Sequence, residues 1–189
     1  MNNLIDYLRR FGSLDAAQTE FILSKTRVFE LRKGEFFCEA DKITRLLGFL
    51  LEGAMRCFYY NQEGEEITNY FVDENTFVPN FEKFEAQLTA GDYIQAVTDV
   101  KLLVVSREGW EEITNRVAGW DLITARIGRN YMVEAFHRRS SLISVDATAR
   151  YLSFIESFPT LAGRIPLAYV ASYLGITQQS LSRIRRNTR

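Results

Sequence analysis

The chain has 189 residues and carries a formal net charge of −1 at pH 7, a length that suits one large domain or two small ones. It is 47% hydrophobic and 13% aromatic, which is typical of a globular protein. Residues 1–10 mix charged side chains with few apolar ones, and the apolar run 46–51 is far shorter than the ~20 residues that span a bilayer, so neither export nor membrane insertion is indicated and we expect a cytoplasmic protein. The two cysteines, Cys38 and Cys57, are too few to hold an iron–sulfur cluster by thiolates alone, and we expect both to be reduced and buried.

The first predicted elements are a short helix and a long series of strands. Ser13 is placed to cap a helix over residues 14–25, whose apolar side chains fall on one face. From residue 27 to residue 107 the pattern changes to short aromatic and β-branched runs, separated by turn signals such as Gly34 and Gly53. Seven or eight short strands in this arrangement predict an antiparallel β-roll or barrel.

Helical periodicity returns at residue 106 and continues into a long helix over residues 120–143. The apolar residues of the long helix form two stripes displaced around its axis, namely Ile123, Ile127 and Tyr131 in the first and Met132, Phe136 and Ile143 in the second. Two stripes need two partners that bury them. One is the protein's own β-roll, and we expect the other to be the same helix of a second subunit in a two-fold homodimer. The candidate interface residues are Ile123, Ile127, Tyr131, Met132 and Phe136. The alternative is a helix buried on both sides within a monomer.

The segment 167–186 has the pattern of a helix-turn-helix. Apolar residues lie at helical spacing on both sides of Gly175, namely Val170, Leu174, Leu181 and Ile184. Gly175 tolerates the positive φ that a tight turn needs, and Thr177 offers a hydroxyl that caps the second helix. Amides and guanidinium groups pair with adenine and guanine edges in the major groove. The outer face of the second helix, with Gln178, Gln179, Ser180 and Arg183, is therefore suited to reading bases.

These elements predict an α+β protein with three parts. They are an N-terminal antiparallel β-roll with flanking helices over residues 1–116, a dimerisation helix over 117–144, and a helix-turn-helix domain over 145–189. Asp146 is expected to cap the first helix of the last part, and Phe158-Pro159 to end it.

Charge is distributed unevenly along the chain. Residues 157–189 contain five arginines and neither Asp nor Glu, whereas the preceding residues contain 18 basic and 24 acidic side chains. DNA phosphates attract the basic end and repel the acidic body, which favours and orients association. This separation favours double-stranded DNA as the partner over the alternative, a helical hairpin whose polar face is merely solvated.

An acidic β-roll, a long helix and a basic helix-turn-helix in this order resemble the Crp/Fnr superfamily of bacterial transcription regulators, and most closely its branch in Bacteroidetes. The residues that carry the resemblance are LRKGEF at 31–36, LEGAMR at 51–56, SRE at 106–108 and ASYLGIT at 171–177. The resemblance implies a cyclic-nucleotide-binding-like jelly roll, a homodimer, a partly palindromic operator and an action on transcription.

Nucleotide-binding members of this superfamily carry a phosphate cassette, with a Gly-Glu pair for the ribose hydroxyl and an Arg-Ser pair for the cyclic phosphate. Placed without gaps, the cassette falls on residues 75–96, where Pro79-Asn80 and Ala90-Gly91 stand at those positions. A buried phosphate needs a paired cation or many hydrogen-bond donors, because an unpaired charge is costly to desolvate. Lys83 is the only basic residue between residues 79 and 100. We therefore predict no useful affinity for cyclic AMP or cyclic GMP.

Three roles of the roll stay open. In the first, an unidentified small-molecule effector binds an apolar pocket lined by Tyr70, Phe81, Phe84 and Tyr93, although these aromatic side chains equally suit the interior of the roll. In the second, the roll is a scaffold that holds the dimer. In the third, its acidic exterior docks a protein partner such as RNA polymerase.

The expected DNA contacts divide by chemistry. Gln178, Gln179 and Arg183 read bases with support from Ser180 and Ser182, whereas Arg185, Arg186 and Arg189 engage phosphates and Thr177 positions the helix. The competing hypothesis is a ligand-sensing or protein-docking module whose C-terminal hairpin is only structural. It gains weight because the sequence stops at Arg189, where many superfamily members continue into a β-wing that would add phosphate contacts.

Neither an enzyme nor a cofactor or metal site is indicated. His137 is the single histidine, so a zinc site or a Ser-His-Asp triad would have to be built around it, and the neighbouring Arg138 and Arg139 disfavour a metal ion. The sequence also lacks a Gly-rich phosphate loop and an activated nucleophile.

Overall fold

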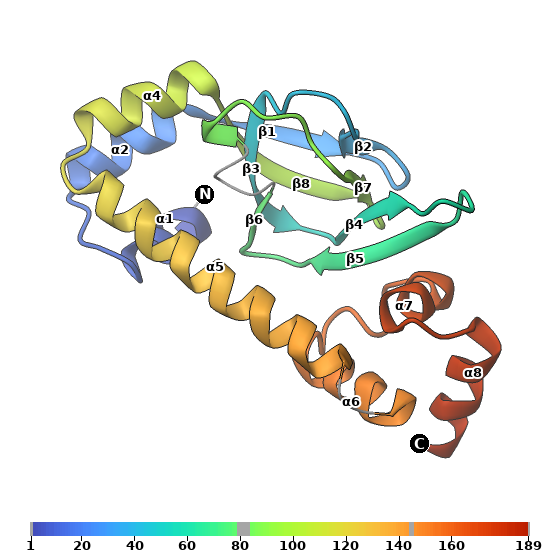
Figure 1. The fold of residues 1–189 in the computed structure, drawn as a ribbon. Coiled ribbons are helices and arrows are strands. Elements are labelled where there is room, and N and C mark those ends of the chain that lie inside the picture. The colour runs from blue at the N-terminus through green and yellow to red at the C-terminus, as the bar shows by residue number, and fades with distance from the viewer. Residues whose placement is uncertain (1, 79–83, 144–145, 189) are drawn as a thin grey trace.

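The computed structural model describes residues 2–78, 84–143 and 146–188. Two short helices, α1 (Asn2–Arg9) and α2 (Ala16–Ser24), lead into the strands. The strands of the described residues are β1 (Thr26–Leu31), β2 (Phe36–Cys38), β3 (Leu46–Glu52), β4 (Met55–Tyr60), β5 (Glu66–Val72), β6 (Phe77–Val78), β7 (Tyr93–Ala96) and β8 (Val100–Ser106). They form two antiparallel sheets, ordered β1-β8-β3-β6 and β2-β7-β4-β5, which make a β-sandwich (Figure 1). The predicted α+β fold with an antiparallel roll is confirmed.

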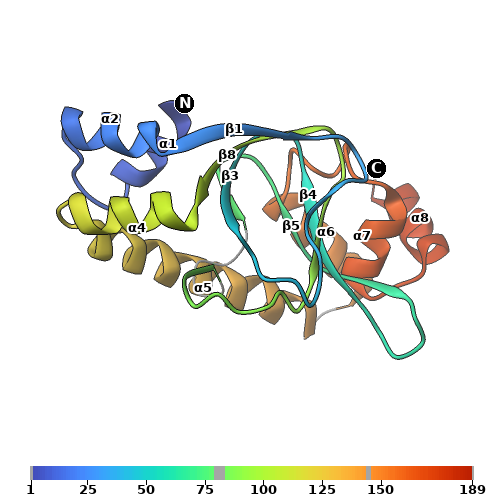
Figure 2. The same cartoon turned by 90° about the horizontal axis from the view of Figure 1, so that it is seen from above.

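Helices follow the last strand. They are α4 (Arg107–Arg116), α5 (Trp120–Ile143), α6 (Ala147–Ser157), α7 (Leu167–Leu174) and α8 (Gln178–Asn187). The long helix α5 begins beside α1, α2 and α4 and runs past the roll to the C-terminal helices (Figure 1). Seen from above, α7 and α8 lie at the end of the roll opposite to α2 and α4 (Figure 2).

The helices α6 and α8 begin at the capping residues expected from the sequence, and α4 begins where helical periodicity was expected to return. The side chains of Ser106, Asp146 and Thr177 accept backbone N–H groups at the starts of α4, α6 and α8. The expectation that Ser13 caps a helix over 14–25 was wrong. The helix begins at Ala16 because Asp15 and Gln18 form a capping box, in which each side chain accepts the backbone N–H of the other residue.

Three clusters of buried side chains stabilise the fold. The first lies at the base of the roll, where α1, α2, α4 and α5 meet, and contains Trp110 and Trp120 with ring centroids 5.3 Å apart. The second fills the space between the sheets and includes Cys38 and Cys57, which are buried and form no disulfide, as expected. The third joins the C-terminal helices to one another and to the roll.

This third cluster has members from the roll and from the C-terminal helices. Ala54, Phe71 and Val97 of the roll are buried together with residues of α6, α7 and α8. The ring of Phe71 lies 5.5 Å from that of Tyr173 and 5.9 Å from that of Phe154. The C-terminal helices are therefore packed against the roll of their own chain.

Candidate nucleic-acid interface

The helices α7 and α8 form the predicted helix-turn-helix. Val170, Ala171 and Leu174 of α7 and Leu181 of α8 are buried together. Between the helices, Gly175 adopts the left-handed conformation with φ = 64°, and the N–H of Ile176 donates to the carbonyl of Ala171. Glycine reaches this conformation without the strain that a side chain adds, so it allows the chain to turn sharply into α8.

Thr177 starts α8 with a double contact to Ser180. Its hydroxyl accepts the N–H of Ser180 at 3.1 Å and donates to the Ser180 hydroxyl at 2.9 Å. Both hydroxyl groups are thus engaged in the helix start, while the Ser180 side chain stays exposed.

The outer face of α8 is polar and basic. Gln178, Gln179, Ser182, Arg183 and Arg186 are exposed, and their spacing places them on one face of the helix. Neither Arg183 nor Arg186 forms an ion pair with another described residue, and α8 contains no carboxylate. Arg185 is half-buried at the edge of this face, and Arg189 lies outside the described residues. A concave groove of phosphates and base edges would meet donors along the whole face.

The roll contributes contacts to this unit that sequence reasoning missed. Arg164, which the sequence suggested as part of the basic end, pairs with Glu74 of the roll at 2.7 Å. Tyr169 of α7 lies over the guanidinium group of Arg56, and the hydroxyl of Ser172 bonds to the backbone of β5. The positioning of α7 therefore depends on residues far away in the sequence.

The long helix α5 has one buried and one exposed apolar stripe. Ile123 and Ile127 are each 2% exposed and belong to the basal core, so these two expected interface residues are used within the protein's own chain. Tyr131 is half-buried, whereas Met132 is 59% and Phe136 72% exposed. The side chain of Ile143 lies outside the described part. The exposed stripe, to which Val133 also belongs, is free for a partner of this helix.

Of the four aromatic residues expected to line a ligand pocket, the three that the structure describes do not come together. Tyr70 faces α5, Phe84 is fully buried beside Trp110 in the basal core, and Tyr93 stacks on Phe58 at 5.2 Å. Phe81 lies outside the described residues. The aromatic side chains of the roll mostly fill its layers.

A cavity of about 420 Å³ lies between β5, α5 and α6. Its lining residues are Tyr70, Phe71, Val72, Asp73, Thr76, Phe77, Tyr131, Glu134, His137, Ser157 and Phe158. Burial, and after it the neighbouring Cys57 and Tyr131, raises the pKa of Tyr70 well above its usual value, so this phenol is neutral and offers a hydrogen bond. Within the described part of the chain, the lining contains two carboxylates and neither Lys nor Arg, which makes it unsuitable for an anion.

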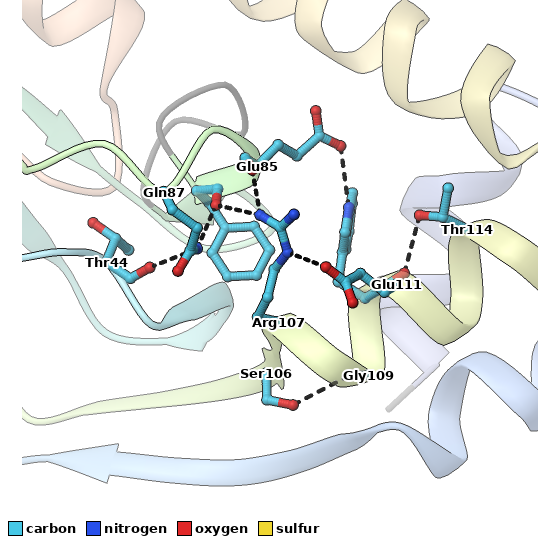
Figure 3. Close-up of polar contacts among 10 residues, drawn as sticks. Thr44, Glu85, Gln87, Ser106, Arg107, Gly109, Glu111 and Thr114 are labelled. Atoms are coloured by element: carbon cyan, nitrogen blue, oxygen red, sulfur yellow. Dashed lines mark hydrogen bonds and ion pairs between the residues drawn. The ribbon is translucent and has the colours of Figure 1, made fainter.

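Part of the segment on which the cassette was expected is held by the chain itself. The Arg107 guanidinium donates to the backbone carbonyls of Phe84, at 3.3 Å, and Glu85, while its Nε pairs with Glu111 at 2.6 Å (Figure 3). The Trp110 indole donates to the Glu85 carboxylate at 3.1 Å. Arg107 therefore binds backbone and protein carboxylate at this place and does not offer its charge to a phosphate.

The described residues contain neither a candidate metal site nor a membrane-spanning helix. Among the residues that the structure describes, no group of His, Cys, Asp and Glu is arranged to hold a metal ion. No helix in the described ranges is long and apolar enough to cross a membrane.

Comparison with known proteins identifies the class of fold. Residues 28–117 match the sequence model of the cyclic nucleotide-binding domain, and the sandwich followed by a long helix and C-terminal helices is a Crp-like fold. The sequence matches no curated protein.

Solved structures of similar fold come from several bacteria. FixK2 from Bradyrhizobium japonicum has a TM-score of 0.75 at 17% identity, over 86% of this chain and 83% of that one. The c-di-GMP-responsive global regulator CLP from Xanthomonas campestris has a TM-score of 0.70 at 14% identity, over 92% and 91%. A structure assigned to the Crp/Fnr family of transcriptional regulators, from Eubacterium rectale, has a TM-score of 0.69 at 19% identity, over 92% and 83%. The second and third of these neighbours are described as regulators.

Proposed function

We propose that the protein is a homodimeric regulator of transcription that binds duplex DNA in a sequence-specific manner in the cytoplasm. The observation that carries the proposal is the exposed face of α8, where amide and unpaired guanidinium side chains lie together on a helix without carboxylates. Its parts are a sensor domain over 1–116, a dimerisation helix over 117–144 and a DNA-binding domain over 145–189.

Within this proposal, Gln178, Gln179 and Arg183 read base edges. Ser182 supports them, and Thr177 fixes the start of the helix, whose cap already uses Ser180. Arg185 and Arg186 engage phosphates, and so does Arg189, because guanidinium groups suit phosphate oxygens.

The second subunit is proposed to cover the exposed stripe of α5. Met132, Val133 and Phe136 place three large apolar side chains next to one another on the outside of the described chain. A two-fold axis along this stripe would bury it against its own copy. Tyr131, which is half-buried at the edge of the stripe, would lie at the border of that contact.

Selection of operators from random duplexes tests the proposal. The full chain should enrich a sequence with two related half-sites spaced by about one helical turn, ~34 Å. A module whose hairpin is only structural would enrich no sequence and would bind specific and random duplexes alike.

An effector of the sensor domain is proposed to be a small molecule without a phosphate. The cavity between β5, α5 and α6 supports this proposal because Asp73 and Glu134 line it and, among the described residues, neither Lys nor Arg does. Cyclic AMP and cyclic GMP should therefore show no binding in titration calorimetry. Binding of either nucleotide with micromolar or tighter affinity would contradict this part of the proposal. RNA polymerase stays a candidate protein partner, for which gene expression with purified polymerase is the appropriate test.

A further inference from the structure

The largest side chain that is completely buried in the described residues is an arginine. Arg56, the second residue of β4, is only 2% exposed. Its guanidinium carbon lies 4.0 Å from the centroid of the Phe58 ring and 3.7 Å from that of Tyr169. The charged group is thus placed between a ring of the roll and a ring of α7. A buried guanidinium needs partners for its charge and its donors, and here both domains supply them.

The roll fixes the orientation of this guanidinium group. The Gln95 amide oxygen of β7 accepts from the Arg56 Nε at 3.0 Å and from Nη2 at 2.7 Å, and the Glu66 carboxylate of β5 pairs with the same Nη2. The Gln95 amide nitrogen in turn donates to the carbonyl of Gly34 at 2.9 Å. Because three strands hold the group, its plane presents a fixed surface to Tyr169.

A second contact, one helical turn further along α7, fixes the helix axis. The hydroxyl of Ser172 accepts the N–H of Thr68 and donates to the carbonyl of Glu66, both at 2.9 Å. β5 is the edge strand of its sheet, so this hydroxyl satisfies backbone groups that no neighbouring strand reaches. Glu66 therefore supports α7 twice, by its carbonyl directly and by its carboxylate through Arg56.

Two contacts on one helix determine its position and its direction. Since α7 shares a core with α8 through Val170, Leu174 and Leu181, the recognition helix follows any movement of α7. We propose that Arg56 and Tyr169 are a positioning pair that sets the place of the recognition helix relative to the roll, and so the half-site spacing that a dimer accepts. The part of this inference that concerns half-site spacing rests on the proposed function. The part that concerns the placement of α8 relative to the roll does not.

The placement is tested without DNA. Spin labels at Glu63→Cys, in the β4–β5 turn, and Asn187→Cys, at the end of α8, report the distance between roll and recognition helix, and the natural cysteines are buried. Tyr169→Leu should broaden the distance distribution. Tyr169→Phe, which keeps the ring, should restore the narrow one. Arg116→Gln, which removes a similar contact to Phe21 at 4.4 Å in the basal helices, should change nothing and is the matched control.

Arg56→Gln is a second variant, checked by circular dichroism for folding because the side chain is buried. If Tyr169→Leu leaves the distribution as narrow as that of the natural sequence, the positioning role is overturned, whatever the protein binds.

The spacing is tested on the operator that selection yields. One base pair rotates a half-site by about 35° around the duplex, so the natural sequence should lose about tenfold or more in affinity when one base pair is inserted between half-sites. Tyr169→Leu should reduce this loss to about threefold or less, with an unchanged salt slope. If Tyr169→Leu weakens the affinity equally for the selected operator and for the operator with one inserted base pair, Tyr169 has a structural role only and the proposal is overturned. Failure of the natural sequence to select any operator would instead defeat the proposed function, and the spin-label result would still decide the placement.

Discussion

The carboxylate of Glu74 accepts hydrogen bonds from both terminal nitrogens of Arg164, at 2.7 and 3.1 Å, and thereby joins the loop after β5 to the segment before α7. The N–H of Gly53 donates to the same carboxylate at 2.9 Å. Burial of Glu74 opposes its ionisation, but the hydrogen bonds from Arg164 and from backbone outweigh it, so the pKa of Glu74 lies below its usual value. The hydrogen bonds that Arg164 donates to Glu74 raise the pKa of Arg164.

Glu74→Gln should therefore lower stability in a pH-dependent way. At neutral pH we expect a loss of about 1 kcal/mol, since the Glu74 and Arg164 side chains are 28% and 34% exposed and water screens the pair. Because the pKa of Glu74 is lower in the folded than in the unfolded chain, this stabilisation is fully present above the unfolded-state pKa and is lost as the pH falls through the folded-state pKa. Thermal denaturation of both proteins, at neutral pH and near pH 3, measures the difference. A difference of the same size at both pH values would contradict the assignment.

Gly175→Ala should destabilise the helix-turn-helix. A side chain at φ = 64° costs about 1–2 kcal/mol, although no atom lies within 4 Å of the added Cβ. Thermal denaturation should show a melting temperature lower by roughly 2–8 °C. Gly163→Ala is the control, because the added Cβ also meets no atom within 4 Å and its φ is not positive. Equal effects of both substitutions would show that the left-handed conformation is unimportant.

Arg183→Ala and Arg186→Ala should affect DNA binding differently. Loss of a base contact by Arg183→Ala should reduce discrimination at one operator position by about 1–3 kcal/mol, whereas Arg186→Ala should weaken all duplexes similarly and lower the salt slope by about one. Fluorescence anisotropy on specific and random duplexes at several salt concentrations separates the two effects. Arg45→Ala removes an exposed charge from the roll and should leave both quantities unchanged. The assignment fails if both α8 variants lose affinity equally on specific and random DNA.

Phe136→Glu should dissociate the proposed dimer. Burial of a phenylalanine contributes about 1.5–3 kcal/mol and a two-fold interface contains two copies, so the dissociation constant should rise roughly hundredfold or more. Light scattering after size-exclusion chromatography, at several concentrations, measures the change. Val28→Glu, which places a carboxylate at an exposed apolar position of the edge strand β1, is the control. A dimer of undiminished stability in Phe136→Glu would place the interface elsewhere.

Local signals in the sequence predicted much of the fold. The starts of α4, α6 and α8 and the turn at Gly175 were predictable because each depends on one side chain and its nearest backbone. The helix α1 was missed because its charged residues masked a helical pattern of buried Leu4, Ile5 and Leu8. The Asp15–Gln18 capping box was also readable, but Ser13 competed with it as a cap.

The contacts between the domains were not predictable from the sequence alone. Arg56 stands in a strand where an isolated arginine normally marks a solvated face, and it is buried only because α7 covers that face. Likewise, Phe84 and Tyr93 are aromatic residues of one short segment, yet they lie in different layers of the protein. Such placements depend on tertiary packing, which periodicity does not encode.

Both tryptophans of the chain, Trp110 and Trp120, lie edge to face in the basal core, far along α5 from the helix-turn-helix. Tryptophan emission, excited where tyrosine does not absorb, therefore monitors only the base of the sandwich, while the helix-turn-helix end contributes no signal to it. Comparison of emission with far-ultraviolet ellipticity during denaturation would thus show directly whether the two ends of this molecule melt as one cooperative unit or in sequence.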